Sequence, residues 1–154
     1  ETVLAVPEPM AAECLSPEEI RGFKEEGIVS LRPFSGCPFV RMDADTWMGE
    51  QFDRYCREDG FDPKIFVISQ SVLTVLECCA EGIGATLVPA GYLDHLTAEQ
   101  RRGMVFFRWR YPDVTLLGAV LHLKSSYITK AAMDFVKCSQ KICGEEESLW
   151  NGFF

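Results

Sequence analysis

The stretch FVISQSVLTVLECCAEGIGATLVP, residues 66–89, decides the fold of this chain. Residues 66–68 are an apolar run typical of a strand, and residues 69–71 form a polar turn. Apolar side chains then recur with helical spacing at Val72, Val75, Leu76, Cys79 and Ala80. Gly82 suits the left-handed position after a helix, and residues 86–88 form a second strand. The stretch therefore predicts strand, helix and strand, the repeating unit of an α/β fold.

Helices and strands continue to alternate on both sides of this stretch. Ser16, Pro17 and Glu19 form a capping box, which predicts a helix that ends near Gly27. The other predicted elements are strands at 38–42, 64–68, 104–110 and 115–124, helices at 47–58 and 127–145, and a helical turn at 97–100. This alternation predicts a mixed or parallel sheet with helices on its faces.

Six segments of the chain, taken in order, resemble the effector-binding domain of LysR-type transcriptional regulators. The matching segments are 1–7, 37–41, 59–63, 69–71, 82–89 (from Gly82-Ile83-Gly84 to Pro89) and 129–136. The resemblance implies a two-lobed α/β architecture like that of type 2 periplasmic binding proteins. It further implies a complete lobe two at 34–105, a partial lobe one at 1–33 and 106–145, and a mobile tail at 146–154. The winged helix-turn-helix of such regulators is missing before residue 1, so we expect the chain to be a fragment.

The composition is that of a globular protein with an acidic surface. Of the 154 residues 47% are hydrophobic, and the net charge is −8. The mean hydropathy is +0.02. Because phosphate backbones repel an acidic chain, we expect no direct contact with nucleic acid. Apolar runs are too short to span a membrane, and the first residues do not have the pattern of a signal peptide, so we expect no membrane partner.

The seven cysteines form no CxxC pair and favour free thiols in a reducing cytoplasm. Neither His95 nor His122 has a cysteine at the spacing of a zinc site, so we expect no metal and no cofactor. Cys14 and Cys37 could act as nucleophiles only with a base nearby, and neither histidine is close in sequence. Phosphate-binding, GxSxG and HExxH motifs are absent from the sequence, and we predict that the chain is not an enzyme.

Two polar turns are candidates for ligand binding, because each follows a predicted strand and precedes a predicted helix. Ligands of open α/β sheets bind at the carboxyl ends of strands, where the backbone N–H groups of helix starts attract anions. The predicted effector-binding residues are Asp45, Thr46, Ser69, Gln70 and Ser71. The alternative is that Thr46 and Ser71 serve only as helix caps. The carboxylates of Asp43 and Asp45 disfavour an anion at the first turn.

Two groups of aromatic and apolar residues have two interpretations each. Trp47, Met48 and Phe52 fit either the lining of a ligand cleft or a core. Phe106, Phe107 and Trp109 fit either a core or a contact between lobes or subunits. The sequence leaves both alternatives open.

The function that these observations favour is a sensor. A small organic effector, possibly one that carries a carboxylate, would enter the cleft between lobes and alter DNA binding by a dimer through its missing domain. The alternatives are a solute-binding receptor of the same fold and a dimerisation module that binds no ligand. In each case a homodimer is the expected assembly.

Overall fold

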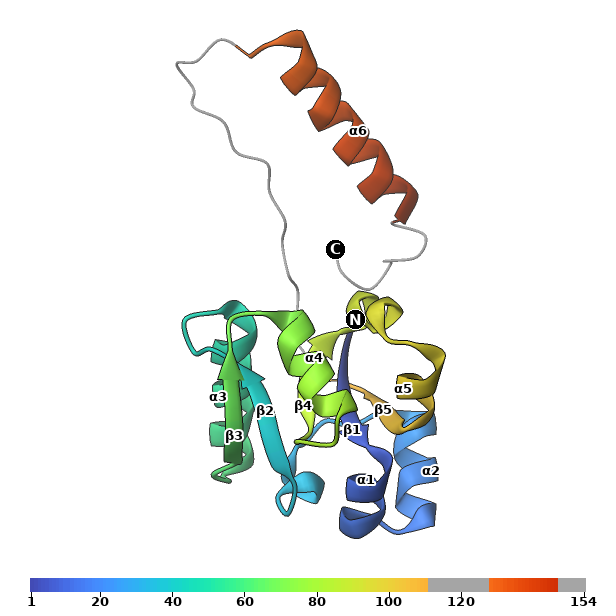
Figure 1. The fold of residues 1–154 in the computed structure, drawn as a ribbon. Coiled ribbons are helices and arrows are strands. Elements are labelled where there is room, and N and C mark those ends of the chain that lie inside the picture. Colours follow the sequence, from blue (N-terminus) through green and yellow to red (C-terminus); the bar gives the residue numbers. More distant parts are fainter. Residues whose placement is uncertain (111–127, 147–154) are drawn as a thin grey trace. The chain divides into compact units, whose positions relative to one another are not determined.

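The computed structural model describes residues 1–110 and 128–146 and divides the chain into two units, Glu1–Pro112 and Asp113–Phe154. The first unit contains five strands and several short helices (Figure 1). Its elements are β1 (Thr2–Pro7), α1 (Glu8–Cys14), α2 (Pro17–Glu26), η1 (Arg32–Phe34), β2 (Pro38–Met42), α3 (Trp47–Asp59), β3 (Lys64–Ser69), α4 (Val72–Ala80), β4 (Thr86–Pro89), η2 (Ala90–His95), α5 (Ala98–Arg102) and β5 (Met104–Arg108).

The strands of the first unit form a mixed arrangement. β1 lies between β4 and β5 and pairs antiparallel with both, with Leu4 opposite Leu87 on one side and Phe107 on the other. β2 and β3 form a parallel pair. Two hydrogen bonds of Ala85, the residue before β4, join the two groups of strands: the Val40 N–H donates to the Ala85 carbonyl at 2.9 Å, and the Ala85 N–H donates to the Pro38 carbonyl at 2.8 Å. The mixed α/β fold expected from the sequence is thus confirmed.

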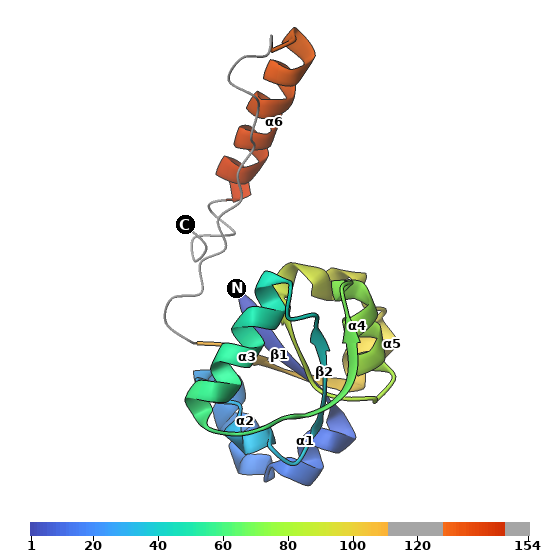
Figure 2. The same cartoon turned by 90° about the vertical axis from the view of Figure 1, so that its left-hand side faces the viewer.

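Helices cover the strands on two sides, and Figure 2 shows β1 and β2 between α3 and α4. On the α4 side, Val75, Leu76 and Cys79 pack with alternate residues of β1, Val3 and Ala5. The spacing of the three helical residues is the one that predicted this face. Because every residue of β1 is buried, the strand is covered on both of its faces.

An aromatic core holds α2 and α3 to the strands. The ring of Phe23 on α2 lies 6.3 Å from that of Phe107 on β5, and the ring of Phe52 on α3 lies 5.4 Å from that of Phe39 on β2. Phe52, Phe107 and Trp109 are all buried, so these three belong to the core. Met48 on α3 and Phe106 on β5 are half-buried, and both pack against the core on the α4 side. Trp47 is half-buried.

The strand pairing joins segments that lie on both sides of residue 33. β1 belongs to residues 1–33, yet it is hydrogen-bonded to β4, and residues of both share one core. Residues 1–112 therefore form one compact unit. The partners of β1 lie more than 80 positions away in sequence, and local patterns carry no information on such a pairing. The predicted strand at 104–110 is observed as Met104–Arg108, and the strand predicted at 115–124 lies outside the described residues.

The described part of the second unit is α6 (Lys130–Glu146), which confirms the helix predicted after residues 125 and 126. Thr129 starts it, because its hydroxyl oxygen accepts the Ala132 N–H at 3.2 Å. Met133 and Phe135 are exposed within this unit. The expected mobile tail, apart from Glu146, lies outside the described residues.

Candidate functional site

The two polar turns singled out in the sequence lie side by side in the structure. β2 and β3 are parallel and Met42 is paired with Ser69, so both strands end at the same edge (Figure 1). The Asp43 N–H donates to the Ser69 carbonyl at 2.9 Å and ties the two turns together. From this edge the chain enters α3 and α4. The site therefore combines two strand ends with two helix starts, as ligand sites of α/β folds do.

The first turn is held by its own hydrogen bonds. The Thr46 hydroxyl donates to the Asp43 carbonyl at 2.6 Å and accepts the Gly49 N–H at 3.1 Å. Asp45 is exposed, and its N–H donates to the Asp43 carboxylate at 3.1 Å. The hydroxyl of Thr46 therefore gives its proton to the backbone and serves mainly as a helix cap.

α3 approaches this turn so closely that its third residue has to be glycine. A Cβ on Gly49 would lie 1.9 Å from the Asp43 carbonyl oxygen and 2.8 Å from that of Met42. Gly49 is not among the residues predicted from the sequence. A glycine three residues after a predicted helix cap is the signal that could have pointed to it, because a helix interior otherwise disfavours glycine.

In the second turn, residues 69–71, the serine hydroxyl oxygens accept backbone hydrogen bonds, and their protons can be donated to other groups. Ser69 Oγ accepts the Ser71 N–H at 3.1 Å, and Ser71 Oγ accepts the Thr74 N–H at 3.3 Å. A hydroxyl also carries one donor, which these bonds do not use. Gln70 and Ser71 are exposed, and Ser69 is half-buried. This turn therefore offers hydroxyl and amide donors beside the start of α4.

The electrostatic character differs between the two turns. α4 is a nine-residue helix, and the N–H groups of its first turn give a positive partial charge at Ser71. The same effect at the start of α3 is offset by the carboxylates of Asp43 and Asp45. An anionic group is thus favoured at Ser69 to Ser71, whereas a ligand hydroxyl or amine is favoured beside Asp45.

Three apolar side chains next to the second turn are exposed to solvent. Phe66 and Ile68 on β3 are 55% and 52% exposed, and Leu73 on α4 is 40% exposed. β3 has β2 as its one partner strand among the described residues, and Phe66 and Ile68 lie on the same face of it. These three residues are called the apolar strip below. Their exposure marks the strip as a candidate contact surface.

The groups considered for catalysis and metal binding do not assemble into a site in the described chain. Cys37 is buried, and burial raises the pKa of its thiol. His95 is exposed in η2, with its ring 6.0 Å from that of Tyr92, and His122 lies outside the described residues. Among residues 1–110 and 128–146, no three His, Cys, Asp or Glu side chains are grouped as metal ligands would be. In the same ranges no helix has the length and apolar character needed to cross a membrane.

Strand ends and helix starts that meet at one edge are a feature of ligand-binding α/β folds, among them the type 2 periplasmic-binding-protein-like domains. The family model described as "LysR substrate binding domain" matches residues 12–143. The chain belongs to this family, which confirms the resemblance seen in the sequence. No curated protein matches the chain in sequence.

Solved structures of LysR regulators have the same fold. The regulatory domain of CcmR from Synechocystis PCC6803 in complex with 2-PG gives a TM-score of 0.63 at 9% identity over 92% of this chain and 62% of that one. The effector-binding domain of QuiR in complex with shikimate gives 0.58 at 15% identity, over 92% and 60%. HinK from Pseudomonas aeruginosa gives 0.56 at 20% identity, over 92% and 44%. The chain therefore spans less than two thirds of each of these proteins.

Proposed function

We propose that this chain is a ligand-sensing part of a LysR-type transcriptional regulator and that a small organic effector binds at the edge formed by the two turns. The observation that carries the proposal is the hydrogen bond from Asp43 to Ser69, which places both turns at one edge. Membership of the LysR substrate binding domain family supports it. QuiR and CcmR, which share the fold, are each in complex with a small molecule.

The proposed effector carries a carboxylate or a similar anionic group. Ser69, Gln70 and Ser71 would bind this group through hydroxyl and amide donors at the start of α4. Asp45 would accept a hydrogen bond from a hydroxyl or amine of the same molecule. Thr46 would contact the effector with its methyl group, since its hydroxyl proton is given to Asp43.

In this proposal the two turns lie on one lobe of the sensor. Effector binding would shift the population of lobe arrangements and so alter the geometry of a DNA-binding domain elsewhere in the regulator. The net charge of −8 supports DNA binding by a separate domain, because the phosphate backbone of DNA would repel this chain. The chain would do no chemistry on its ligand and would work in the cytoplasm.

We also propose that the chain forms a homodimer through the apolar strip. Phe66, Ile68 and Leu73 are large apolar side chains exposed side by side with the second turn, and β3 has an unpaired edge in the described sheet. A second copy of the chain would cover both features at once.

Calorimetry on the purified chain tests the ligand proposal. Shikimate and a set of small carboxylates would be titrated against the neutral amides of the same acids. We expect at least one acid to bind and its amide to bind at least tenfold more weakly. Equal binding of acid and amide would overturn the anionic site. Binding by none of them, with a dimer still present, would identify a dimerisation module without ligand.

A further inference from the structure

Two cysteines that lie 23 positions apart in sequence meet in the folded chain. Cys14 is the last residue of α1, and Cys37 comes directly before β2. A Cβ on Gly36, the neighbour of Cys37, would lie 3.7 Å from the Sγ atom of Cys14. The Sγ atom of Cys37 lies 3.9 Å from the carbonyl oxygen of Met10, which is also in α1. Both sulfur atoms therefore lie between α1 and the start of β2.

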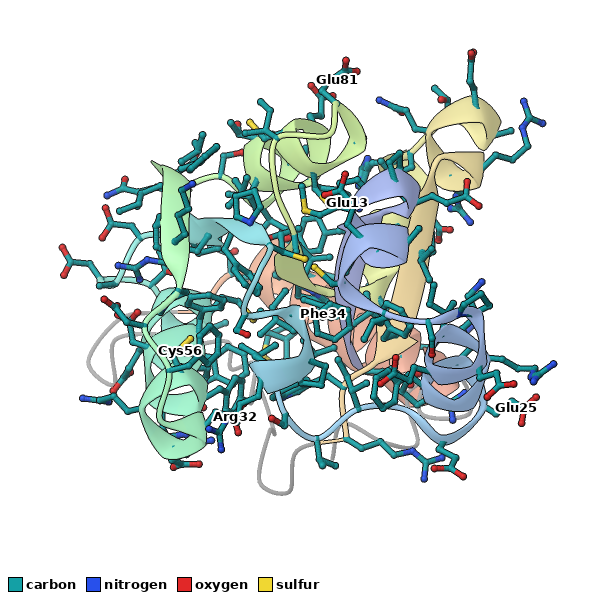
Figure 3. The ribbon with its side chains drawn as sticks, turned by 90° about the horizontal axis from the view of Figure 1, so that it is seen from below. Glu13, Glu25, Arg32, Phe34, Cys56 and Glu81 are labelled. Atoms are coloured by element: carbon teal, nitrogen blue, oxygen red, sulfur yellow. The ribbon has the colours of Figure 1, made fainter. Side chains whose placement is uncertain are left out.

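The two thiols are close enough to influence each other. Burial raises the pKa of the Cys37 thiol, and the neighbouring thiol of Cys14 raises it further. In Figure 3, α1, marked by Glu13, lies next to the segment that contains Phe34, and α1 and η1 are in contact. Packing between these two elements holds the thiols together.

The two cysteines differ in their access to solvent. Cys37 is 1% exposed, whereas Cys14 is half-buried at the end of its helix. Cys14 is therefore the more accessible of the two residues. The sulfur of Cys37 is shielded from solvent but lies next to Cys14. This is the arrangement of an attacked thiol and a resolving thiol.

We propose that Cys14 and Cys37 are a modification site, at which a peroxide converts the two thiols into a reversible disulfide. The Cys14 thiolate attacks one oxygen of the peroxide, the O–O bond breaks, and a sulfenic acid and hydroxide form. The Cys37 sulfur then attacks the Cys14 sulfur, and the S–O bond breaks as the S–S bond forms. The Cys37 proton and the leaving hydroxide give water. With hydrogen peroxide, two thiols are oxidised to one disulfide and the peroxide is reduced to two waters.

The disulfide would join the end of α1 to the start of β2. The effector site lies at the other end of β2, after Met42, so this inference stands apart from the proposed function. Oxidation would restrain the unfolded chain by closing a loop between residues 14 and 37. The expected readout of that restraint is a higher melting temperature of the oxidised chain.

The cysteines of α4 serve as an internal control. Cys78 is half-buried like Cys14, but its neighbour Cys79 is buried and donates its thiol to the Ala5 carbonyl at 3.3 Å. Adjacent residues of a helix do not have the geometry for a disulfide. Cys78→Ser therefore removes a thiol of similar exposure without affecting the proposed pair.

The test uses the full 154-residue chain with its seven cysteines, first reduced and then treated with hydrogen peroxide. We expect alkylation to find two thiols fewer, and peptide mass spectrometry to find a cross-link between Cys14 and Cys37 that dithiothreitol reverses. Cys78→Ser should keep this cross-link, and Cys14→Ser should lose it. In Cys37→Ser, dimedone should trap a sulfenic acid at Cys14.

A wild-type chain that accumulates the dimedone adduct at Cys14 without the cross-link would overturn the proposal, as would a cross-link of Cys14 to another cysteine. Circular dichroism of each variant separates loss of the pair from loss of the fold.

Discussion

The backbone N–H of Asp43 donates to the carbonyl oxygen of Ser69 at 2.9 Å and so fixes the relative position of two turns that are 26 positions apart in sequence. Parallel pairing of β2 with β3 ends at this bond. Each turn then caps a helix, Thr46 for α3 and Ser71 for α4. The same hydroxyl-rich residues that start the helices therefore also line the proposed ligand edge.

Replacing Gly49 with alanine should destabilise the fold, because the added Cβ would lie 1.9 Å from the Asp43 carbonyl oxygen. Backbone atoms cannot move away from such a contact without loss of the turn. We expect a loss of about 1–3 kcal/mol in the free energy of unfolding, the usual cost of overpacking. Urea unfolding followed by circular dichroism measures it.

Gly22→Ala is the matched control for this change. Gly22 also lies inside a helix, α2, but a Cβ there would meet no atom within 4 Å. Since alanine is the better helix former, this variant should gain roughly 0.5–1 kcal/mol. Equal effects of the two substitutions would contradict the close approach of α3 to the turn.

The capping box of α2 should be visible in an acid titration. Hydrogen bonds from the Ser16 backbone and hydroxyl to the Glu19 carboxylate lower the pKa of Glu19 below its ordinary value. A lowered pKa stabilises the folded state above the ordinary value, and this contribution disappears as the pH falls through the folded-state pKa. Titration by NMR should therefore give Glu19 a pKa below its ordinary value, and Ser16→Ala, which removes the hydroxyl but keeps the backbone N–H, should raise that pKa part of the way back.

Local features of this fold could be predicted from the sequence because they depend on near neighbours. Ser71 caps α4 as expected, and Gly82 follows the helix with a φ of 80°. The capping box at Ser16 is formed in full. Each of these features is determined within about four residues of a helix end, which is the distance over which sequence patterns are informative.

Contacts between distant segments could not be predicted in the same way. Nothing in the six residues of β1 shows that β4 and β5 pair with it. β3 has apolar residues on both faces, which favours a covered strand, yet Phe66 and Ile68 are exposed at the sheet edge. The meeting of Cys14 with Cys37 is a further contact of this kind.

The apolar strip should control self-association. Ile68→Lys places a charge where a second copy would have to cover an apolar side chain, so we expect the dimer to dissociate at least tenfold more readily. Sedimentation velocity over a range of concentrations measures the change. Val29→Lys is the control, because Val29 is 61% exposed on the loop after α2 and outside the strip. Dissociation by Val29→Lys, with Ile68→Lys still dimeric, would move the interface away from β3.

Substitutions of Ser71 separate its two proposed roles, helix cap and effector ligand. Ser71→Ala removes the oxygen that accepts the Thr74 N–H at 3.3 Å and should cost about 1 kcal/mol of stability. Ser71→Asp keeps a capping oxygen but adds a negative charge at the start of α4. It should melt close to wild type and lose the carboxylate ligand found by calorimetry, because like charges repel at that position.

The control for Ser71→Asp is Ser16→Asp, which changes another serine cap, at the start of α2 and outside the proposed site. We expect the ligand to bind Ser16→Asp with wild-type affinity, whereas Ser71→Asp should bind it at least tenfold more weakly. Calorimetry with the same carboxylate measures both variants, and their melting curves exclude unfolding as the cause. Wild-type affinity in Ser71→Asp would show that this turn only starts α4, and the effector site would then have to be sought elsewhere on the chain.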